Sequence, residues 1–200
     1  MIMGNKARLL ALCLMGVASC AFADGLVKSP KGIYRGTIHT VCMESPIGFA
    51  DPPNQVFQGD GLRYADTSTS TAIFDGKGTM TESLLGATSF LTGGGFTGAL
   101  SVGTFVSACR YTISMKADKS FTRQGECSGR LPTGPGAGHN AIVTGIDGEG
   151  QVSEDSSVII VSSSQPDANL LTLTDDFGVT TYSAQRLCVS TGTYLRIGGH

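Results

Sequence analysis

Apolar and polar residues alternate with a period of two through most of the chain that follows its N-terminal segment. The alternating segments are rich in Thr, Val, Ile, Tyr and Ser, and clusters of Gly, Asp-Gly and Pro separate them. This pattern is typical of short antiparallel strands joined by tight turns, because successive side chains of a strand point to opposite faces. The sequence therefore predicts an all-β protein.

The strand bounds follow from where the alternation begins and breaks. The expected strands are Gly32–Cys42, Gly61–Phe74, Thr79–Leu85, Gly103–Lys116, Phe121–Cys127, Ala141–Ile146, Gln151–Val161, Leu170–Thr174, Val179–Val189 and Thr193–Ile197. One alternative is a short helix within Thr81–Leu91, since Leu84, Thr88 and Leu91 also keep helical spacing.

Residues 1–23 have the three parts of a secretory signal peptide: a basic start, an apolar run over Leu9–Val17 and a small-x-small ending at Ala21–Ala23. Ordinary cleavage there would leave residues 24–200 as a single all-β domain in the periplasm or outside the cell. A second route is open, because Val17–Cys20 resembles a bacterial lipobox. Cys20 would then be lipidated and anchor the protein to the cell envelope.

Electrostatics argue against two classes of partner. Loss of residues 1–23 removes Lys6 and Arg8, so 14 basic residues become 12 against 16 acidic ones, a formal charge of −4. Such a chain has no electrostatic attraction for nucleic acid or anionic membranes. The absence of Trp also disfavours the aromatic girdles of an outer-membrane barrel, so we expect no membrane span.

Four cysteines remain after the signal peptide, at Cys42, Cys109, Cys127 and Cys188, and an even number in an exported chain predicts two disulfides. A hairpin with its apex near Asp118 would place Cys109 opposite Cys127. Cys42 and Cys188, on the first and last long strands, become neighbours if the sheet closes on itself. We therefore predict the pairs Cys109–Cys127 and Cys42–Cys188.

Turn chemistry predicts further reversals. Phe74–Thr79 and Ile146–Gln151 both contain Asp-Gly, which suits the positive φ angles of hairpin turns. Proline-containing segments at Met43–Asp60 and Ser128–Asn140 are expected to be surface loops, and they would form the rim of any binding site.

No motif identifies a catalytic residue, a cofactor site or a metal site. Gly93–Gly98 matches the dinucleotide-binding glycine pattern but lacks the surrounding βαβ unit, and no nucleophile elbow or zinc-ligand spacing occurs. We expect none of the histidines to have a catalytic or metal-binding role, and we expect the acidic residues to be solvated or in turns. These residues are His39, His139, His200, Glu44, Asp66, Glu126, Asp175 and Asp176.

Several short motifs are similar to those of bacterial secreted domains with a small lipocalin-like or allene-oxide-cyclase-like barrel. They are Gly32–Tyr34, Phe74–Gly78, Cys109–Ile113 followed by Asp118 and Cys127, and Gly192–Tyr194. The resemblance implies an antiparallel barrel whose interior is packed or holds an apolar ligand. It carries over no catalytic residue.

These observations favour an exported, disulfide-stapled β-barrel with a non-catalytic binding or structural role, and with a small apolar ligand as candidate partner. Two alternatives remain. One is a surface adhesion or assembly subunit with a β-sandwich fold, whose partner would be an envelope or surface protein. The other, by fold analogy alone, is a small barrel cyclase or isomerase.

Overall fold

The computed structural model describes residues 28–50, 56–57, 61–92, 101–163 and 166–199. The expected signal peptide with Cys20, the glycine run at Gly93–Gly98 and His200 lie outside these residues. Within them, no helix is long and apolar enough to cross a membrane.

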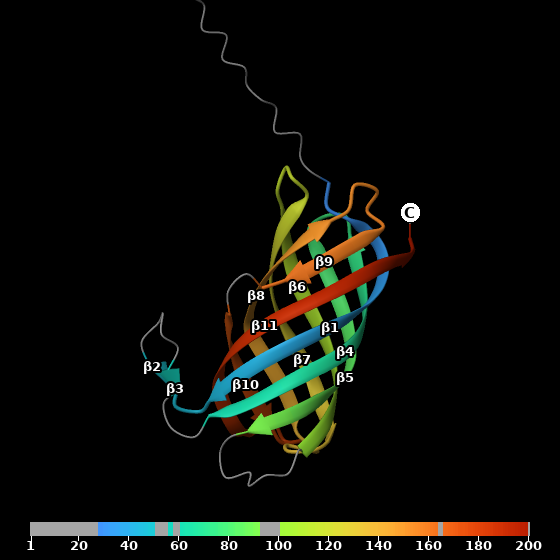
Figure 1. Cartoon of the computed structure of the whole chain (residues 1–200). Helices are drawn as coiled ribbons and strands as arrows, with labels where there is room; N and C mark the ends of the chain where they lie inside the picture. Colours follow the sequence, from blue (N-terminus) through green and yellow to red (C-terminus); the bar gives the residue numbers. More distant parts are fainter. Residues whose placement is uncertain (1–27, 51–55, 58–60, 93–100, 164–165, 200) are drawn as a thin grey trace, which may run out of the picture.

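Eleven antiparallel strands make up the described part of the chain (Figure 1). They are β1 (Lys31–Ser45), β2 (Phe49–Ala50), β3 (Val56–Phe57), β4 (Leu62–Asp75), β5 (Thr79–Thr92), β6 (Ser101–Met115), β7 (Ser120–Thr133), β8 (Asn140–Val152), β9 (Val158–Ser162), β10 (Asp167–Thr174) and β11 (Thr180–Gly198). The prediction of an all-β protein is confirmed.

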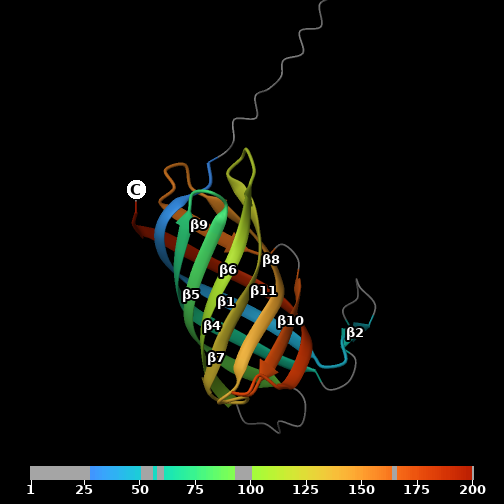
Figure 2. The same cartoon turned by 180° about the vertical axis from the view of Figure 1, so that it is seen from behind.

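The long strands close into a ring. The order of pairing is β1-β4-β5-β6-β7-β8-β10-β11, and β11 pairs again with β1 (Figures 1 and 2). Both β10 and β9 lie between β8 and β11. β10 pairs with the first part of β8, and β9 pairs with the last residues of β8. Both also pair with β11. Strands β2 and β3 form a separate small hairpin.

Ring closure explains the pairing of the cysteines. Cys109 faces Cys127 across β6 and β7, in the register expected from the Asp118 turn, and Cys42 faces Cys188 across β1 and β11. Both facing pairs are disulfide-bonded, with Cα atoms 4.0 and 4.2 Å apart respectively. Two disulfides are typical of a protein in an oxidising, exported compartment.

Only one of the two Asp-Gly segments is a turn. At the first, Asp75 Oδ1 accepts the backbone N–H of Lys77 at 2.7 Å and that of Thr79 at 2.9 Å. The predicted reversal within Ile146–Gln151 is wrong, because β8 continues through it to Val152. The chain reverses later, where Asp155 Oδ1 accepts both the hydroxyl and the backbone N–H of Ser157.

Side-chain packing explains why the second Asp-Gly segment stays extended. A Cβ atom at Gly148 would lie 2.9 Å from Nε of Arg123, and one at Gly150 would collide with the ring of Phe121. Both partners come from β7, the neighbouring strand. The glycines of β8 therefore make room for large side chains instead of reversing the chain.

Several other expected elements differ from those in the structure. The helix alternative for Thr81–Leu91 is wrong, because this segment pairs with β4 on one side and β6 on the other. The segment expected as one strand over Gln151–Val161 is split between β8 and β9, whereas Val179–Val189 and Thr193–Ile197 join into β11. The loop expected over Ser128–Asn140 shrinks to the turn between β7 and β8.

One half of the ring has a solid apolar core. It lies between the strands at the end that carries the turns after β4, β6 and β8, and Tyr34 and Tyr194 are fully buried in it. The Tyr34 ring meets Phe74 edge-on at 5.2 Å, and its hydroxyl donates to the Ser156 carbonyl at 2.8 Å. Further core residues are Ile38, Met80, Tyr111, Ile113, Phe121, Val152, Ile159 and Val161.

Candidate functional site

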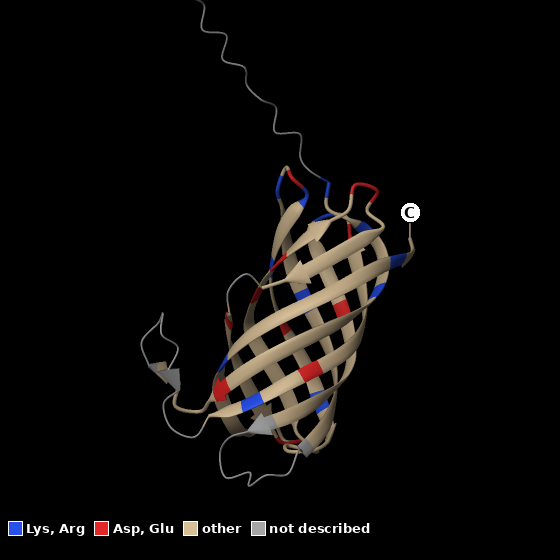
Figure 3. Ribbon diagram, in the orientation of Figure 1, with Lys and Arg blue, Asp and Glu red and all other residues tan. Residues whose placement is uncertain are grey.

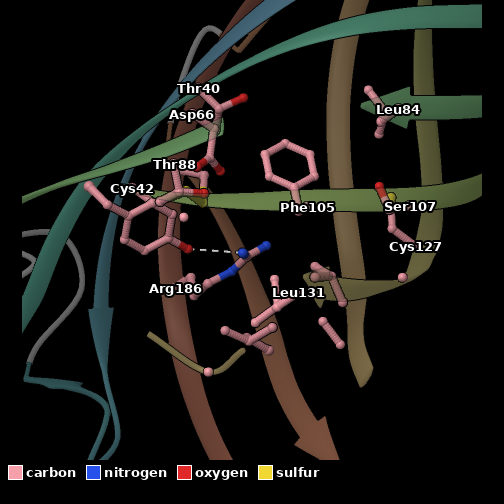
Figure 4. A pocket seen from close by; sticks show the side chains of 18 of the residues that line it. Thr40, Cys42, Asp66, Leu84, Thr88, Phe105, Ser107, Cys127, Leu131 and Arg186 are labelled. Carbon is pink, nitrogen blue, oxygen red and sulfur yellow. Dashed lines mark hydrogen bonds between the residues drawn. A yellow bond between two sulfur atoms is a disulfide. The ribbon is translucent and has the colours of Figure 1, made fainter. Parts of the chain in front are cut away.

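The other half of the ring is hollow. A cavity of about 650 Å³ lies between the strands and extends from the apolar core to the opposite strand ends. Figure 4 shows part of its lining. Its apolar walls include Leu84, Phe90, Phe105, Leu131, Val143, Leu171 and Leu173. The two segments that the sequence suggested as rims do border it, at Pro46 and Pro135.

The cavity follows from side-chain size at inward-facing positions. The same alternation that directs Tyr34 and Ile38 of β1 into the core directs Thr40 and Cys42 into the cavity. Large residues fill the inward positions of the core half. In the hollow half, many of these positions carry small residues: Ser68, Ser107, Gly129, Ala141 and Ser190.

A buried polar layer separates the core from the cavity. The Glu82 carboxylate accepts hydrogen bonds from the hydroxyls of Ser70 and Tyr194 at its Oε1 atom. The Arg123 guanidinium lies 4.8 Å from the centre of the Tyr111 ring, in cation–π geometry. Burial, followed by the charge of Glu82, raises the pKa of Tyr194 well above its usual value, so this phenol stays protonated.

The buried polar layer forms the floor of the cavity, and some of its polar atoms have no hydrogen-bond partner. Among the described residues, Glu82 Oε2 and the Nε and Nη1 atoms of Arg123 have no hydrogen-bond partner, and solvent barely reaches any of these atoms. One carboxylate and one guanidinium balance in charge here, which lowers the cost of burying them. Glu82 and Arg123 both line the cavity, but these particular atoms have almost no solvent-accessible surface.

A second arginine lies in the wall of the cavity itself. The Arg186 Nε donates to Asn169 Oδ1 at 2.7 Å, and its Nη1 donates to the Tyr64 hydroxyl at 2.9 Å. Burial alone would lower the pKa of Arg186, but Tyr64 and the carboxylates of Glu44 and Asp66 outweigh burial and raise it. This guanidinium is therefore always charged.

Two carboxylates that we expected to be solvated point into the ring. Glu44 is 4% exposed and accepts the Tyr182 hydroxyl at 2.7 Å. Burial raises the pKa of Asp66 to about 6, and its Oδ1 has no hydrogen-bond partner among the described residues. The expectation was wrong for both because each lies at an inward position of a strand, on β1 and β4.

The remaining candidates lie apart from the cavity wall or at its edge. Glu126 is exposed on the outside of β7. Asp175 accepts the backbone N–H of Phe177 at 2.9 Å, which confirms the expected turn. His39 is exposed and contacts the Thr67 hydroxyl at 3.2 Å, whereas the His139 ring lies 3.1 Å from the Gly136 carbonyl at the cavity edge.

Metal chemistry has no support in the described ranges, which hold no cluster of three or more His, Cys, Asp or Glu side chains placed to bind an ion.

Sequence reasoning missed Glu82, Arg123 and Arg186, although a signal was present. Each lies two positions along its strand from a residue that faces inward, and residues two apart on a strand point to the same side. The inward neighbours are Met80 for Glu82, Phe121 for Arg123 and Cys188 for Arg186. A charged residue in phase with the buried face of a strand marks either an ion-pair network or a site.

No protein-family model matches the chain, and no curated protein is similar to it in sequence. The fold and the cavity together define an all-β, disulfide-bonded protein with a partly polar interior. Its function is therefore argued from the cavity.

Proposed function

We propose that this protein is an exported β-barrel that binds a small molecule in its interior. The observation that carries the proposal is the cavity of about 650 Å³, with apolar walls and a few converging polar groups. Ligand sites in proteins are typically cavities of roughly 300–1,000 Å³ with this kind of lining.

A barrel explains the strand pairing better than a sandwich does. Pairing of β1 with β11 runs from Ile33 to Ser45, so the first and last long strands are joined over their length. Two packed sheets would leave edge strands, which an adhesion or assembly subunit would use to pair with another chain. The described long strands are each paired on both sides, which favours the binding role over the assembly role.

Binding is also favoured over catalysis by the state of the interior groups. Glu82 is the most buried carboxylate among the described residues; two hydroxyls donate to one of its oxygens, and the other oxygen is closed to solvent. A general acid or base must be within hydrogen-bond reach of its substrate. Glu82 is therefore not placed to exchange a proton with a ligand, which favours binding over catalysis at this carboxylate.

The test is a thermal-shift and native mass-spectrometry screen of residues 24–200 against fatty acids, retinoids and haem. A ligand present at a hundred times its Kd stabilises the fold by about 2.7 kcal/mol, which raises Tm by roughly 5–10 °C for a domain of this size. Ser107→Phe places a phenyl ring in the cavity and should abolish the rise in Tm that the ligand causes. Thr81→Phe, which adds the same ring at an exposed position, should keep it.

The proposal fails if no ligand class shifts Tm, or if the Ser107→Phe variant responds as the unmodified protein does.

A further inference from the structure

Arg186 does not pair with the carboxylate nearest to it in the sheet. In the register of β1 and β11, Arg186 is directly opposite Glu44. Opposite charges on directly opposed residues normally meet. Here Glu44 instead holds the Tyr182 hydroxyl, and the ion pairs found among the described residues, Lys119 with Glu154 and Arg130 with Asp176, do not include Arg186.

The guanidinium is held in place on two of its three nitrogens. Asn169 on β10 accepts from Nε, and Tyr64 on β4 accepts from Nη1, so neighbours on two different strands fix its plane. No hydrogen bond from Nη2 occurs within the described part of the chain, and Nη2 is not among the solvent-shielded atoms that lack a partner. Because Arg186 lines the cavity, we infer that its remaining N–H donors face the cavity.

Figure 4 shows the Arg186 side chain reaching into the space that Asp66, Phe105 and Leu131 surround. The charge thus lies beside apolar walls. A guanidinium with free donors next to apolar surface matches a carboxylate that is attached to an apolar body.

Charged residues lie at several places on the strands of the ring (Figure 3), and the others that line the cavity have partners or shielded atoms of their own. Arg130 pairs with Asp176, and the Asp167 carboxylate accepts from the Asp147 backbone N–H and from Asn169. Glu44 uses Oε1 for Tyr182, and Asp66 has its unpartnered Oδ1 shielded from solvent. Arg123 in the floor likewise has Nε and Nη1 shielded. Arg186 combines unused N–H donors with a guanidinium plane that two hydrogen bonds hold in place, so an anion in the cavity can gain charge-assisted hydrogen bonds there.

We propose that Arg186 makes the cavity selective for apolar molecules that carry a carboxylate, such as a medium-chain fatty acid. This inference rests on the proposed binding function and adds the class of ligand. The carboxylate accepts from Nη2 of Arg186, and the hydrocarbon part packs against the walls around Phe105 and Leu131.

The test compares three probes with the same alkyl chain: dodecanoate, 1-dodecanol and dodecyltrimethylammonium. Each competes with the neutral fluorescent dye N-phenyl-1-naphthylamine for residues 24–200. Hydrogen bonds to charged groups predict that dodecanoate binds about 10- to 100-fold more tightly than dodecanol. Arg186→Met should remove that preference and leave the affinity for dodecanol within about twofold.

Two further variants keep the test decisive if Arg186→Met folds poorly. Tyr64→Phe keeps the ring and its contact with Phe90 but removes one bond that orients the guanidinium, so the preference should fall several-fold. Arg110→Met removes the same charge from the exposed outer face of β6 and should leave the preference unchanged.

The outcomes separate the two proposals. Equal displacement by dodecanoate and dodecanol, tightest binding of the ammonium probe, or a preference that survives Arg186→Met would overturn the role of Arg186 while leaving a binding cavity. No binding of the dye or of any probe would overturn the binding function and the inference together.

Discussion

Asp66→Asn should stabilise the protein at neutral pH. The Asp66 carboxyl faces the cavity from β4, where burial raises its pKa to about 6 from an ordinary value of 3.8. A hydrogen bond with Thr88 and the charge of Arg186 act in the opposite direction but are weaker than burial. At pH 7 the fold therefore holds an ionised carboxylate in a site that favours the neutral acid.

The pKa difference of about two units sets the magnitude. Each unit corresponds to 1.36 kcal/mol, so ionisation of Asp66 costs the fold at most about 3 kcal/mol. Because the folded pKa is raised, this cost is absent below pH 4, grows between pH 4 and 6, and is complete at pH 7. Asparagine resembles the neutral acid in shape, so Asp66→Asn should gain about 1–3 kcal/mol at pH 7 and almost nothing at pH 4.

The assay is urea unfolding of both proteins at five pH values from 4 to 8, with the disulfides intact. Asp75→Asn is the matched control. Backbone N–H groups of Thr79 and Lys77 lower the pKa of Asp75, so its stabilising effect is complete above pH 4 and its loss should destabilise equally from pH 5 to 8. A gain for Asp66→Asn that does not change with pH would refute the burial argument.

Three further predictions concern stability. Replacement of both Cys42 and Cys188 by Ala should cost about 5 kcal/mol in denaturant unfolding, because the bond closes a loop with a sequence separation of 146. Gly150→Ala should lower the free energy of unfolding by about 1–3 kcal/mol, because its Cβ would displace the Phe121 ring. An unchanged free energy of unfolding would show that β7 can shift to make room. Asp155→Asn should destabilise the fold at pH 7 and by much less at pH 2, because hydrogen bonds lower the pKa of Asp155 to about 2 and its stabilising effect is lost as the pH falls to that value. The check is Tm measured against pH.

The amino-acid sequence by itself determined the features that depend on near neighbours. The alternation of apolar and polar residues identified the elements as β-strands, because successive side chains of a strand point to opposite faces and one face is buried. The turn at Asp118 fixed the register of β6 and β7, and with it the opposition of Cys109 and Cys127. Cys42 and Cys188 needed one further assumption, closure of the sheet, which the ring of strands bears out.

The tertiary structure alone decided which inward positions are filled and which are hollow. Gly148 looks like a turn residue in the sequence, but Arg123 of the neighbouring strand occupies the space that a side chain would need. Glu44 and Arg186 are opposed in the sheet, yet each turns to a different hydroxyl. The physical reason is that a turn depends on residues adjacent in the sequence. The space open to a side chain and the partner of a buried charge depend instead on neighbouring strands, whose residues lie far apart in the sequence.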